Sequence, residues 1–308
     1  MLAKLVKILA SFVKYLLSFF GFCAKAEKSP DEGYKNIIVD YVGEGVVKLI
    51  LNRPRKKNAF SKKMYAEISH ALNAFSADAS VKVVMITGAG DFYSSGNDLS
   101  NFSQLMHPLS MAKAARHTCD TFVSSFINID KPLIAVVNGP AIGIAATTLG
   151  LCDRVYASDK AYFKTPFAEL AQSPEGCSSY TFPSIMGEAV AHEVLWESRQ
   201  LSAREAADIK FVYKVGSAGE IEVEAMAYCK TLAADTKDPA AQRWVTPELK
   251  LKLQAVNQEE LDVLQRKWIS SECFVALASF LEKKNMKVAA LMLRLANWTG
   301  PLWGQPAA

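Results

Sequence analysis

Hydrophobic positions in the first half of the chain form short continuous runs that predict β-strands. Apolar runs rich in β-branched residues occupy residues 36–42, 46–52, 81–88, 133–137 and 154–164. The first two runs are joined by a Gly-Glu-Gly sequence, which predicts a β-hairpin. The last run has an Asp-Lys pair near its middle and predicts a strand, a turn and a second strand.

Helical spacing of hydrophobic residues appears between these runs and replaces them after about residue 178. Ser61 is a suitable N-cap for a helix that extends to about Phe75, and small residues follow Gly143 at the start of another helix. Further helices are predicted at residues 110–129, 180–186, 188–197, after Ser202, 220–234 and 247–284. Strands alternating with helices, followed by helices alone, indicate an α/β body with a helical C-terminal extension.

The pattern divides the chain into four segments. Residues 1–26 carry four lysines and no acidic residue on an apolar background, which predicts a basic amphipathic helix that serves as a targeting sequence or lies on a membrane surface. Residues 27–35 form a polar linker, and residues 36–285 form the globular domain. Residues 286–308 are expected to form an apolar helix followed by an irregular tail.

The composition is that of an ordinary globular protein, since half of the 308 residues are hydrophobic and the formal net charge is +4. The basic residues are spread widely along the chain, so no nucleic-acid partner is expected. The six cysteines include no CxxC pair and the four histidines are scattered, so we expect reduced thiols and no metal site.

Three short motifs are candidates for chemistry. Glu175 lies between Pro174 and Gly176 in a turn before a helix, where a carboxylate is either a solvated surface charge or a base. The basic segment at residues 53–63 either binds phosphate or forms a solvated rim. The Gly-Ala-Gly sequence at residues 88–90 does not fit a nucleotide-binding loop, because an aspartate follows it where a Gly-Lys-Ser/Thr sequence is needed.

Four motifs in this order resemble the enoyl-CoA hydratase/isomerase superfamily, which has the crotonase fold. They are RPRKKNAFS at residues 53–61, FYSSGNDLSNF at residues 92–102, the segment from KPLIAVVNGP to FAEL at residues 131–170, and the Glu175 turn. Within the superfamily, the sequence TPFAELAQSPEGCSSYTFP around this turn is very similar to the peroxisomal type of Δ3,Δ2-enoyl-CoA isomerase. The resemblance covers nearly the whole chain after the linker, and it implies a crotonase-like spiral of ββα units that binds acyl-CoA.

The resemblance also implies a reaction and the residues that perform it. Matched position by position, the backbone N–H groups of Asn97 and Ile144 form an oxyanion hole for the thioester oxygen. The base of the isomerase subfamily aligns with Glu175, which is expected to carry a proton from C2 to C4 of a 3-enoyl thioester. Thr147 and Phe167 replace the two glutamates with which the family's hydratases add water, so hydratase activity is not expected.

The same matching assigns the residues that contact the substrate. Those expected to bind the substrate or its CoA moiety are Lys56, Lys57, Asn58, Ala59, Lys62, Ser95, Gly96, Asp98, Leu99, Gly143 and Phe167. The three lysines are candidates for the CoA phosphates, and Phe167 is expected to keep water away from Glu175. Glu169 and Asp98 are rival acids, although Asp98 is better placed to hold its own loop together. No cofactor is expected, because CoA is part of the substrate.

These points predict an isomerase that moves the double bond of 3-enoyl-CoA esters to the 2-trans position during β-oxidation of unsaturated fatty acids. The alternatives are another acyl-CoA enzyme of the crotonase type and a non-catalytic acyl-CoA-binding protein. The resemblance implies a homotrimer or a dimer of trimers. The mitochondrion is the expected location, with the peroxisome, or a membrane surface contacted through residues 1–26, as alternatives.

Overall fold

The computed structural model describes residues 33–98, 100–101, 107–235 and 238–300. The predicted amphipathic helix, most of the linker, the end of the predicted tail and Leu99 lie outside these residues. In the described part of the chain, no helix is long and apolar enough to cross a membrane.

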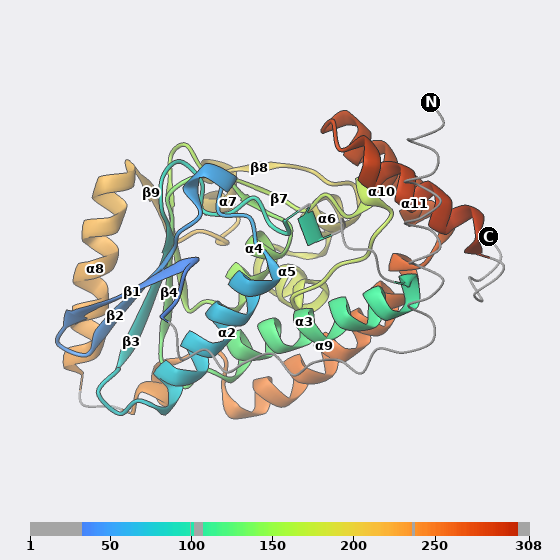
Figure 1. Ribbon diagram of the computed structural model, residues 1–308. Coiled ribbons are helices and arrows are strands. Elements are labelled where there is room, and N and C mark those ends of the chain that lie inside the picture. Colours follow the sequence, from blue (N-terminus) through green and yellow to red (C-terminus); the bar gives the residue numbers. More distant parts are fainter. Residues whose placement is uncertain (1–32, 99, 102–106, 236–237, 301–308) are drawn as a thin grey trace.

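A six-stranded sheet forms the centre of the molecule (Figure 1). Its strands, in order across the sheet, are β1 (Ile37–Gly43), β2 (Val46–Leu51), β3 (Val83–Gly88), β4 (Leu133–Val137), β6 (Arg154–Ser158) and β9 (Lys214–Gly216). The predicted hairpin is confirmed, because β1 and β2 pair antiparallel with Ile37 opposite Leu51. The other neighbouring strands pair in parallel. A smaller sheet contains β5 (Ala141–Ile142), β7 (Tyr162–Lys164) and β8 (Leu201–Ser202).

Helices surround this sheet and follow it in the chain. They are α2 (Lys62–Ala77), α3 (Pro108–Asn128), α4 (Ile144–Thr147), α5 (Ser178–Met186), α6 (Glu188–Trp196), α7 (Ala203–Asp208), α8 (Ala218–Ala234), α9 (Pro247–Trp268), α10 (Ser271–Lys283) and α11 (Lys287–Trp298). The N-caps predicted from the sequence are confirmed. The Ser61 side chain accepts a hydrogen bond from the amide of Met64, and Ser202 forms a reciprocal capping box with Glu205.

Side chains of the parallel strands are buried on both faces of the large sheet, because successive residues of a strand point to opposite sides. In β3, Val84 and Ile86 belong to the main core, which also contains residues of α2 and α3. Val83 and Met85 point the other way and pack under α8. Figure 1 shows α8 on one side of the sheet and α2 and α3 on the other, so both faces are covered.

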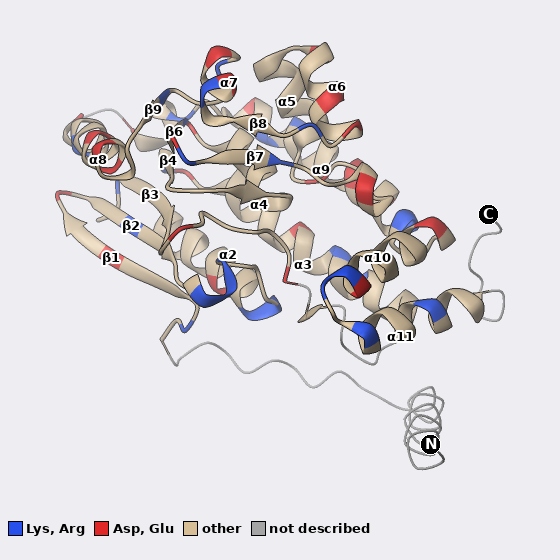
Figure 2. Ribbon diagram, turned by 90° about the horizontal axis from the view of Figure 1, so that it is seen from above, with Lys and Arg blue, Asp and Glu red and all other residues tan. Residues whose placement is uncertain are grey.

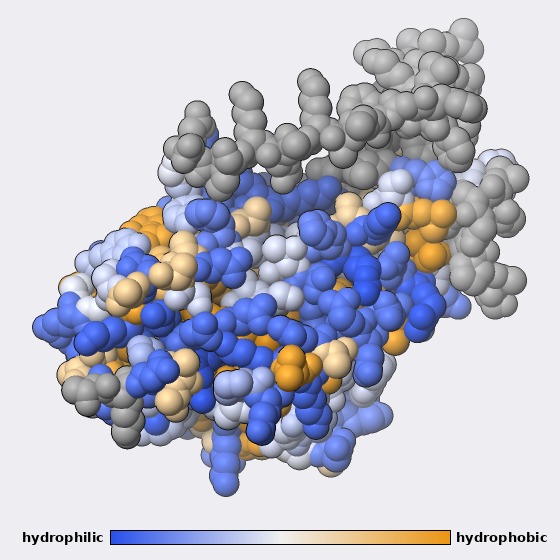
Figure 3. Space-filling view, turned by 90° about the horizontal axis from the view of Figure 1, so that it is seen from below, coloured by the Kyte–Doolittle hydropathy of each residue, from blue (hydrophilic) through white to orange (hydrophobic). Residues whose placement is uncertain are grey.

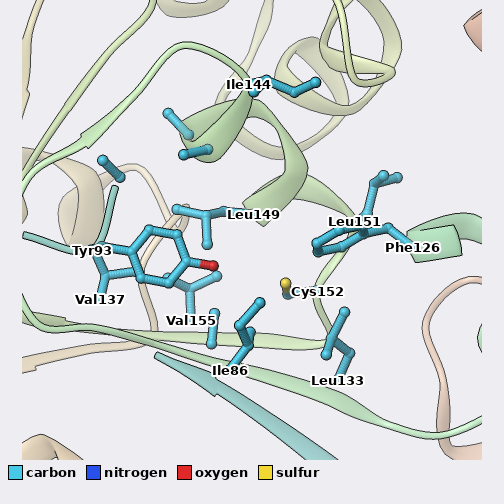
Figure 4. Close-up of a cluster of buried hydrophobic side chains, with 14 of the residues drawn as sticks. Ile86, Tyr93, Phe126, Leu133, Val137, Ile144, Leu149, Leu151, Cys152 and Val155 are labelled. Atoms are coloured by element: carbon cyan, nitrogen blue, oxygen red, sulfur yellow. The ribbon is translucent and has the colours of Figure 1, made fainter. Parts of the chain in front are cut away.

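The main core continues around the start of the short helix α4. Figure 4 shows Leu133 and Val137 of β4 pointing toward Leu149 and Leu151, which lie in the 3-10 turn after α4. Phe126 of α3 fills the space beside them. The segment after β4 is therefore fixed by burial, and it carries one of the predicted oxyanion donors.

Two features of the C-terminal half differ from the prediction. The region after residue 178 was expected to be wholly helical, but it also supplies β8 and β9, and β9 extends the large sheet beside β6. Residues 247–284 form two helices, α9 and α10, because the Ser270 side chain accepts a hydrogen bond from the amide of Cys273 and starts a new helix. The α/β body therefore extends through α8, and the helical extension begins with α9.

The α10–α11 pair forms a small core of its own at one end of the molecule. Leu277 and Leu281 of α10 pack against Ala290 and Leu293 of α11, and Trp268 at the end of α9 closes one side. Figure 3 shows one face of the molecule, on which hydrophilic residues predominate and hydrophobic ones form small separate patches.

Candidate active site

An apolar pocket lies between the body and the α10–α11 pair. Its apolar walls come from Met111, Ala112 and Ala115 of α3, from Phe274 and Leu277 of α10, and from Leu293 of α11. Glu175 is the only acidic residue among the described residues that line it. The pocket therefore combines one carboxyl group with a predominantly apolar wall, as a site that excludes water requires.

Glu175 lies in the turn before α5, and its environment raises its proton affinity. Burial raises the pKa of the Glu175 carboxyl to about 7, and the nearby charge of Glu260 acts in the same direction. The Cys119 thiol donates a hydrogen bond to Oε2 of Glu175 at 3.4 Å, which acts in the opposite direction. A carboxyl group with such a pKa accepts and releases a proton readily near neutral pH.

The two loops that carry the predicted oxyanion donors lie side by side. The loop after β3 and the segment after β4 are joined by hydrogen bonds from the amide of Ser94 to Pro140 O and from the amide of Ile142 to Ser94 O. A Cβ on Gly96 would lie 2.5 Å from Ile142 O, so the close approach of the loops requires glycine there. Asn97 therefore lies beside the segment that starts α4.

The amides of Asn97 and Ile144 are not used in hydrogen bonds within the described part of the chain. The amide of Phe60 donates to Gly96 O and the amide of Asp98 donates to Phe60 O, which fixes the peptide between them. Ile144 is the first residue of α4, where amide groups lack an intrahelical partner. Asn97 also lines the pocket with Glu175, whereas Ile144 is not among the lining residues.

The rival acids have other roles in the structure. Asp98 forms an ion pair with Arg53 at 2.7 Å and accepts a hydrogen bond from the amide of Ser100. Burial acts to raise the pKa of Asp98, but these contacts outweigh it and the pKa lies below its ordinary value. Glu169 is about half exposed and forms an ion pair with Lys164 at 2.6 Å. Neither acid lines the pocket.

The two positions that match the hydratase glutamates are buried. Thr147 is fully buried and its hydroxyl donates a hydrogen bond to Ile144 O at 3.2 Å. It packs against Gly176, where a Cβ would lie 2.5 Å from the Thr147 hydroxyl oxygen. Phe167 is 2% exposed and belongs to the main core, and it is not among the pocket-lining residues. The structure therefore places the Phe167 side chain in the main core.

The predicted CoA-binding residues are divided between the pocket and its surroundings. Lys62 lines the pocket, and Figure 2 shows basic residues near the start of α2. Lys56 is exposed, and Lys57 Nζ lies 4.8 Å from the centre of the Phe92 ring. The Asn58 side chain is fully buried and donates hydrogen bonds to two carbonyl groups of the loop after β3, so this side chain joins its own segment to that loop.

The remaining predicted positions lie in the two loops. The amide of Ser95 donates a hydrogen bond to Lys57 O, and the amide of Ala59 donates one to Lys56 O, so both amides are already used within the protein. Gly143 caps α4, and its amide donates to Lys164 O. These residues build the loops around the Asn97 and Ile144 amides.

Sequence reasoning did not identify Tyr65, Cys119 and Asn101, which also line the pocket. Asn101 donates a hydrogen bond to the Asn97 side chain at 2.7 Å and so supports the predicted oxyanion loop. Cys119 recurs at helical spacing with Ala112 and Ala115. This spacing is found on buried helix faces as well as on pocket walls, so it does not identify a site residue. Among the described residues, no group of three or more His, Cys, Asp or Glu side chains is arranged to hold a metal ion.

The chain matches the family model described as enoyl-CoA hydratase/isomerase over residues 42–289. It is 45% identical over 270 residues to enoyl-CoA delta isomerase 2 of Rattus norvegicus, and the match covers 86% of this chain and 66% of that protein. It is 42% identical over 247 residues to enoyl-CoA delta isomerase 3, peroxisomal, of Mus musculus, covering 78% of this chain and 77% of that protein. The chain thus spans slightly less than two thirds of the length of the first relative.

A solved structure supports the same relationship. The enoyl-CoA hydratase/isomerase from Pseudoalteromonas atlantica superposes with a TM-score of 0.72 at 29% sequence identity, over 81% of this chain and 98% of that chain. The crotonase-like fold and the family resemblance predicted from the sequence are both confirmed.

Proposed function

Because the chain belongs to the enoyl-CoA hydratase/isomerase family, we propose that it is an isomerase that converts 3-enoyl-CoA esters to 2-trans-enoyl-CoA esters. The observation that carries the proposal is the single carboxyl group of Glu175, with its pKa of about 7, in an apolar pocket. The names of the two mammalian relatives, both enoyl-CoA delta isomerases, support the same reaction.

The proposed reaction requires one proton to move between two carbons. The Glu175 carboxylate removes a proton from C2, the C2–H electron pair is delocalised into the thioester, and a dienolate forms. The protonated Glu175 then delivers its proton to C4, and the double bond is left between C2 and C3. The Asn97 and Ile144 amides are proposed to bind the thioester oxygen, where negative charge develops, each contributing about 3 kcal/mol by analogy with other oxyanion holes.

Addition of water is the competing reaction in this family, and the pocket does not favour it. Glu175 has no second carboxyl group beside it among the described pocket-lining residues. Thr147 occupies a position matched to a hydratase glutamate, and its hydroxyl already donates to a backbone carbonyl. A water molecule in the pocket would therefore lack a second base to activate it.

The test is turnover of trans-3-hexenoyl-CoA and of a 2-enoyl-CoA by the purified protein and by its Glu175→Gln variant. We expect the wild type to convert the 3-enoyl ester and not to hydrate the 2-enoyl ester. Glutamine keeps the shape of the side chain but carries no transferable proton, so kcat should fall by about 10²–10⁴-fold.

Glu169→Gln is the matched control, because Glu169 is about half exposed and does not line the pocket. This variant should keep wild-type activity. If Glu175→Gln kept its activity, or if Glu169→Gln lost it, Glu175 would not be the base. Hydration of the 2-enoyl ester at a comparable rate would instead indicate another acyl-CoA reaction of the same fold.

The substrate contacts, assembly and location are parts of the same proposal. We propose that Lys56, Lys57 and Lys62 bind the CoA phosphates, since Lys62 lines the pocket and all three lie in or beside the segment that leads into α2. A homotrimer or a dimer of trimers is the proposed assembly. The mitochondrion is the proposed location, because residues 1–26 have the composition of a basic amphipathic targeting helix.

A further inference from the structure

A carboxyl group from α9 binds the first amides of helix α5, directly after the Glu175 turn. Glu260 Oε2 accepts a hydrogen bond from the amide of Cys177 at 2.7 Å, and Oε1 accepts one from the amide of Ser179 at 2.8 Å. Glu260 is 7% exposed and does not line the pocket. Because the first amides of a helix have no intrahelical acceptor, Glu260 satisfies two of them in place of water.

The turn held in this way has a strained backbone. Cys177 has a φ angle of 61°, in the left-handed region that a residue with a side chain rarely adopts. Such a conformation persists only where surrounding contacts hold it. Glu260 supplies one of these contacts two residues after Glu175, and the Ser178 hydroxyl supplies another by donating to Glu175 O at 2.8 Å.

The side chain of Glu175 is held separately from its backbone. The Cys119 thiol donates to Oε2, and no described residue donates to Oε1. Burial raises the pKa of the Cys119 thiol well above its ordinary value, so the thiol stays protonated and acts as a donor. One oxygen of Glu175 is therefore fixed, and the other is left for the proton of a substrate.

We propose that Glu260 is a positioning residue of this site, which fixes the turn that aims Glu175 and opposes the ionisation of Glu175 through its own negative charge. This inference rests on the isomerase function proposed above. Burial raises the pKa of Glu260 above its ordinary value, while the hydrogen bonds from Ser179 and Cys177 at the positive end of α5 favour its charged form. The other ionisable groups around the pair are Tyr65 and Lys62 from α2, Cys119 and Asp120 from α3, and Cys177 before α5.

The test compares Glu260→Gln with Glu260→Asp. Glutamine has the shape of glutamate but no charge and only one acceptor oxygen, so kcat should fall about 10–100-fold while KM is unchanged. The acid limb of the pH profile of kcat/KM should move down by about one pH unit, because Glu175 loses a neighbouring negative charge. Aspartate keeps the negative charge, but its shorter side chain does not reach both amides. In Glu260→Asp, kcat should therefore fall while the acid limb of the kcat/KM profile stays at the wild-type pH.

Glu259→Gln is the control, because Glu259 is an exposed neighbour on the same helix and should behave as the wild type in every measurement. If Glu260 only stabilised the fold, both Glu260 variants would unfold at lower urea concentration without a change in the pH limb, and that result would overturn the proposal. So would wild-type kcat in Glu260→Gln.

A second readout does not depend on turnover. Infrared spectroscopy measures the ionisation of Glu175 through the carboxyl C=O stretching band. The band that belongs to Glu175 is the one that is missing from the spectrum of Glu175→Gln. An inactive wild type would refute the isomerase function. A band that still titrates at lower pH in Glu260→Gln would support the effect of Glu260 on Glu175 even then, and an unshifted band would refute that effect.

Discussion

The proton affinity of Glu175 is set by neighbours from distant parts of the chain. Burial raises its pKa to about 7, and the charge of Glu260 adds to this effect, while the Cys119 thiol opposes it. Cys119 comes from α3 and Glu260 from α9, so the packing of these two helices around the turn determines the acid strength of the group.

The thiol contact predicts a shift opposite to that of Glu260→Gln. Replacing Cys119 by alanine removes a donor that stabilises the charged carboxylate, so the pKa of Glu175 should rise and the acid limb of kcat/KM should move to higher pH. At about pH 7 the loss should be about threefold, as expected for one hydrogen bond of ~1 kcal/mol, and it should disappear well above that pH. Cys119→Ser keeps a donor and should retain the wild-type profile. An alanine variant with an unshifted limb would contradict this role.

The raised pKa of Glu175 also predicts how stability depends on pH. Its ordinary value of 4.5 applies to the unfolded chain, and the folded value is about 7, so the folded state binds more protons between these values and loses stability as pH rises through them. The loss is at most about 3 kcal/mol, and less where the pocket admits water. Glu175→Gln should therefore be more stable than the wild type to urea at about pH 8, but not below about pH 4.5. An equal difference at both pH values would refute this.

The sequence singled out Glu175, Asn97 and Ile144 as candidates, because each lies within a short motif at a turn. It was insufficient for Cys119 and Glu260, since their residue types are common on helices and only tertiary packing brings them to the turn. It also placed Phe167 in the site, whereas the side chain points into the main core. Proximity along the chain does not fix the direction of a side chain after a short 3-10 turn.

At the scale of elements, long patterns predicted the structure better than short ones. β4 has the predicted bounds because its five residues are all buried. β9 has only three residues and no resolvable alternation, so nothing local identifies it; pairing with β6 defines it. The break between α9 and α10 depends on the Ser270 cap, a weak signal inside a continuous helical pattern.

We expect the α10–α11 pair to form part of the wall that contacts the acyl chain of the substrate. Leu293 of α11 is 3% exposed and lines the pocket, whereas Leu291 on the same helix is 45% exposed. Leu293→Ala should raise KM for a longer 3-enoyl-CoA about tenfold with little change in kcat, because it removes apolar contact made equally in the ground and transition states. Leu291→Ala should leave KM unchanged. Equal effects of the two substitutions would exclude this wall from acyl binding.

At the scale of the molecule, the described core and pocket come from one continuous part of the chain. The main core begins at Ile37, and the core of the α10–α11 pair ends at Leu293. The fold class follows from the alternation of strands and helices, but the division into body and extension does not. It depends on α8, which covers the second face of the sheet and so belongs to the body.

This layout predicts that catalysis and location are separable. A chain that begins at residue 33 keeps every described core and pocket residue, so its kcat/KM should stay within about twofold of the full chain and its Tm should be unchanged.

Fused to a fluorescent protein, the full chain should collect in mitochondria and the shortened chain should not, because residues 1–26 carry the basic amphipathic pattern. A version with Lys4, Lys7 and Lys14 changed to Glu tests that pattern at constant length. If the shortened chain loses activity, residues 1–32 contribute to the site. If the full chain, the shortened chain and the Lys-to-Glu variant have the same distribution in the cell, residues 1–26 are not a mitochondrial targeting sequence.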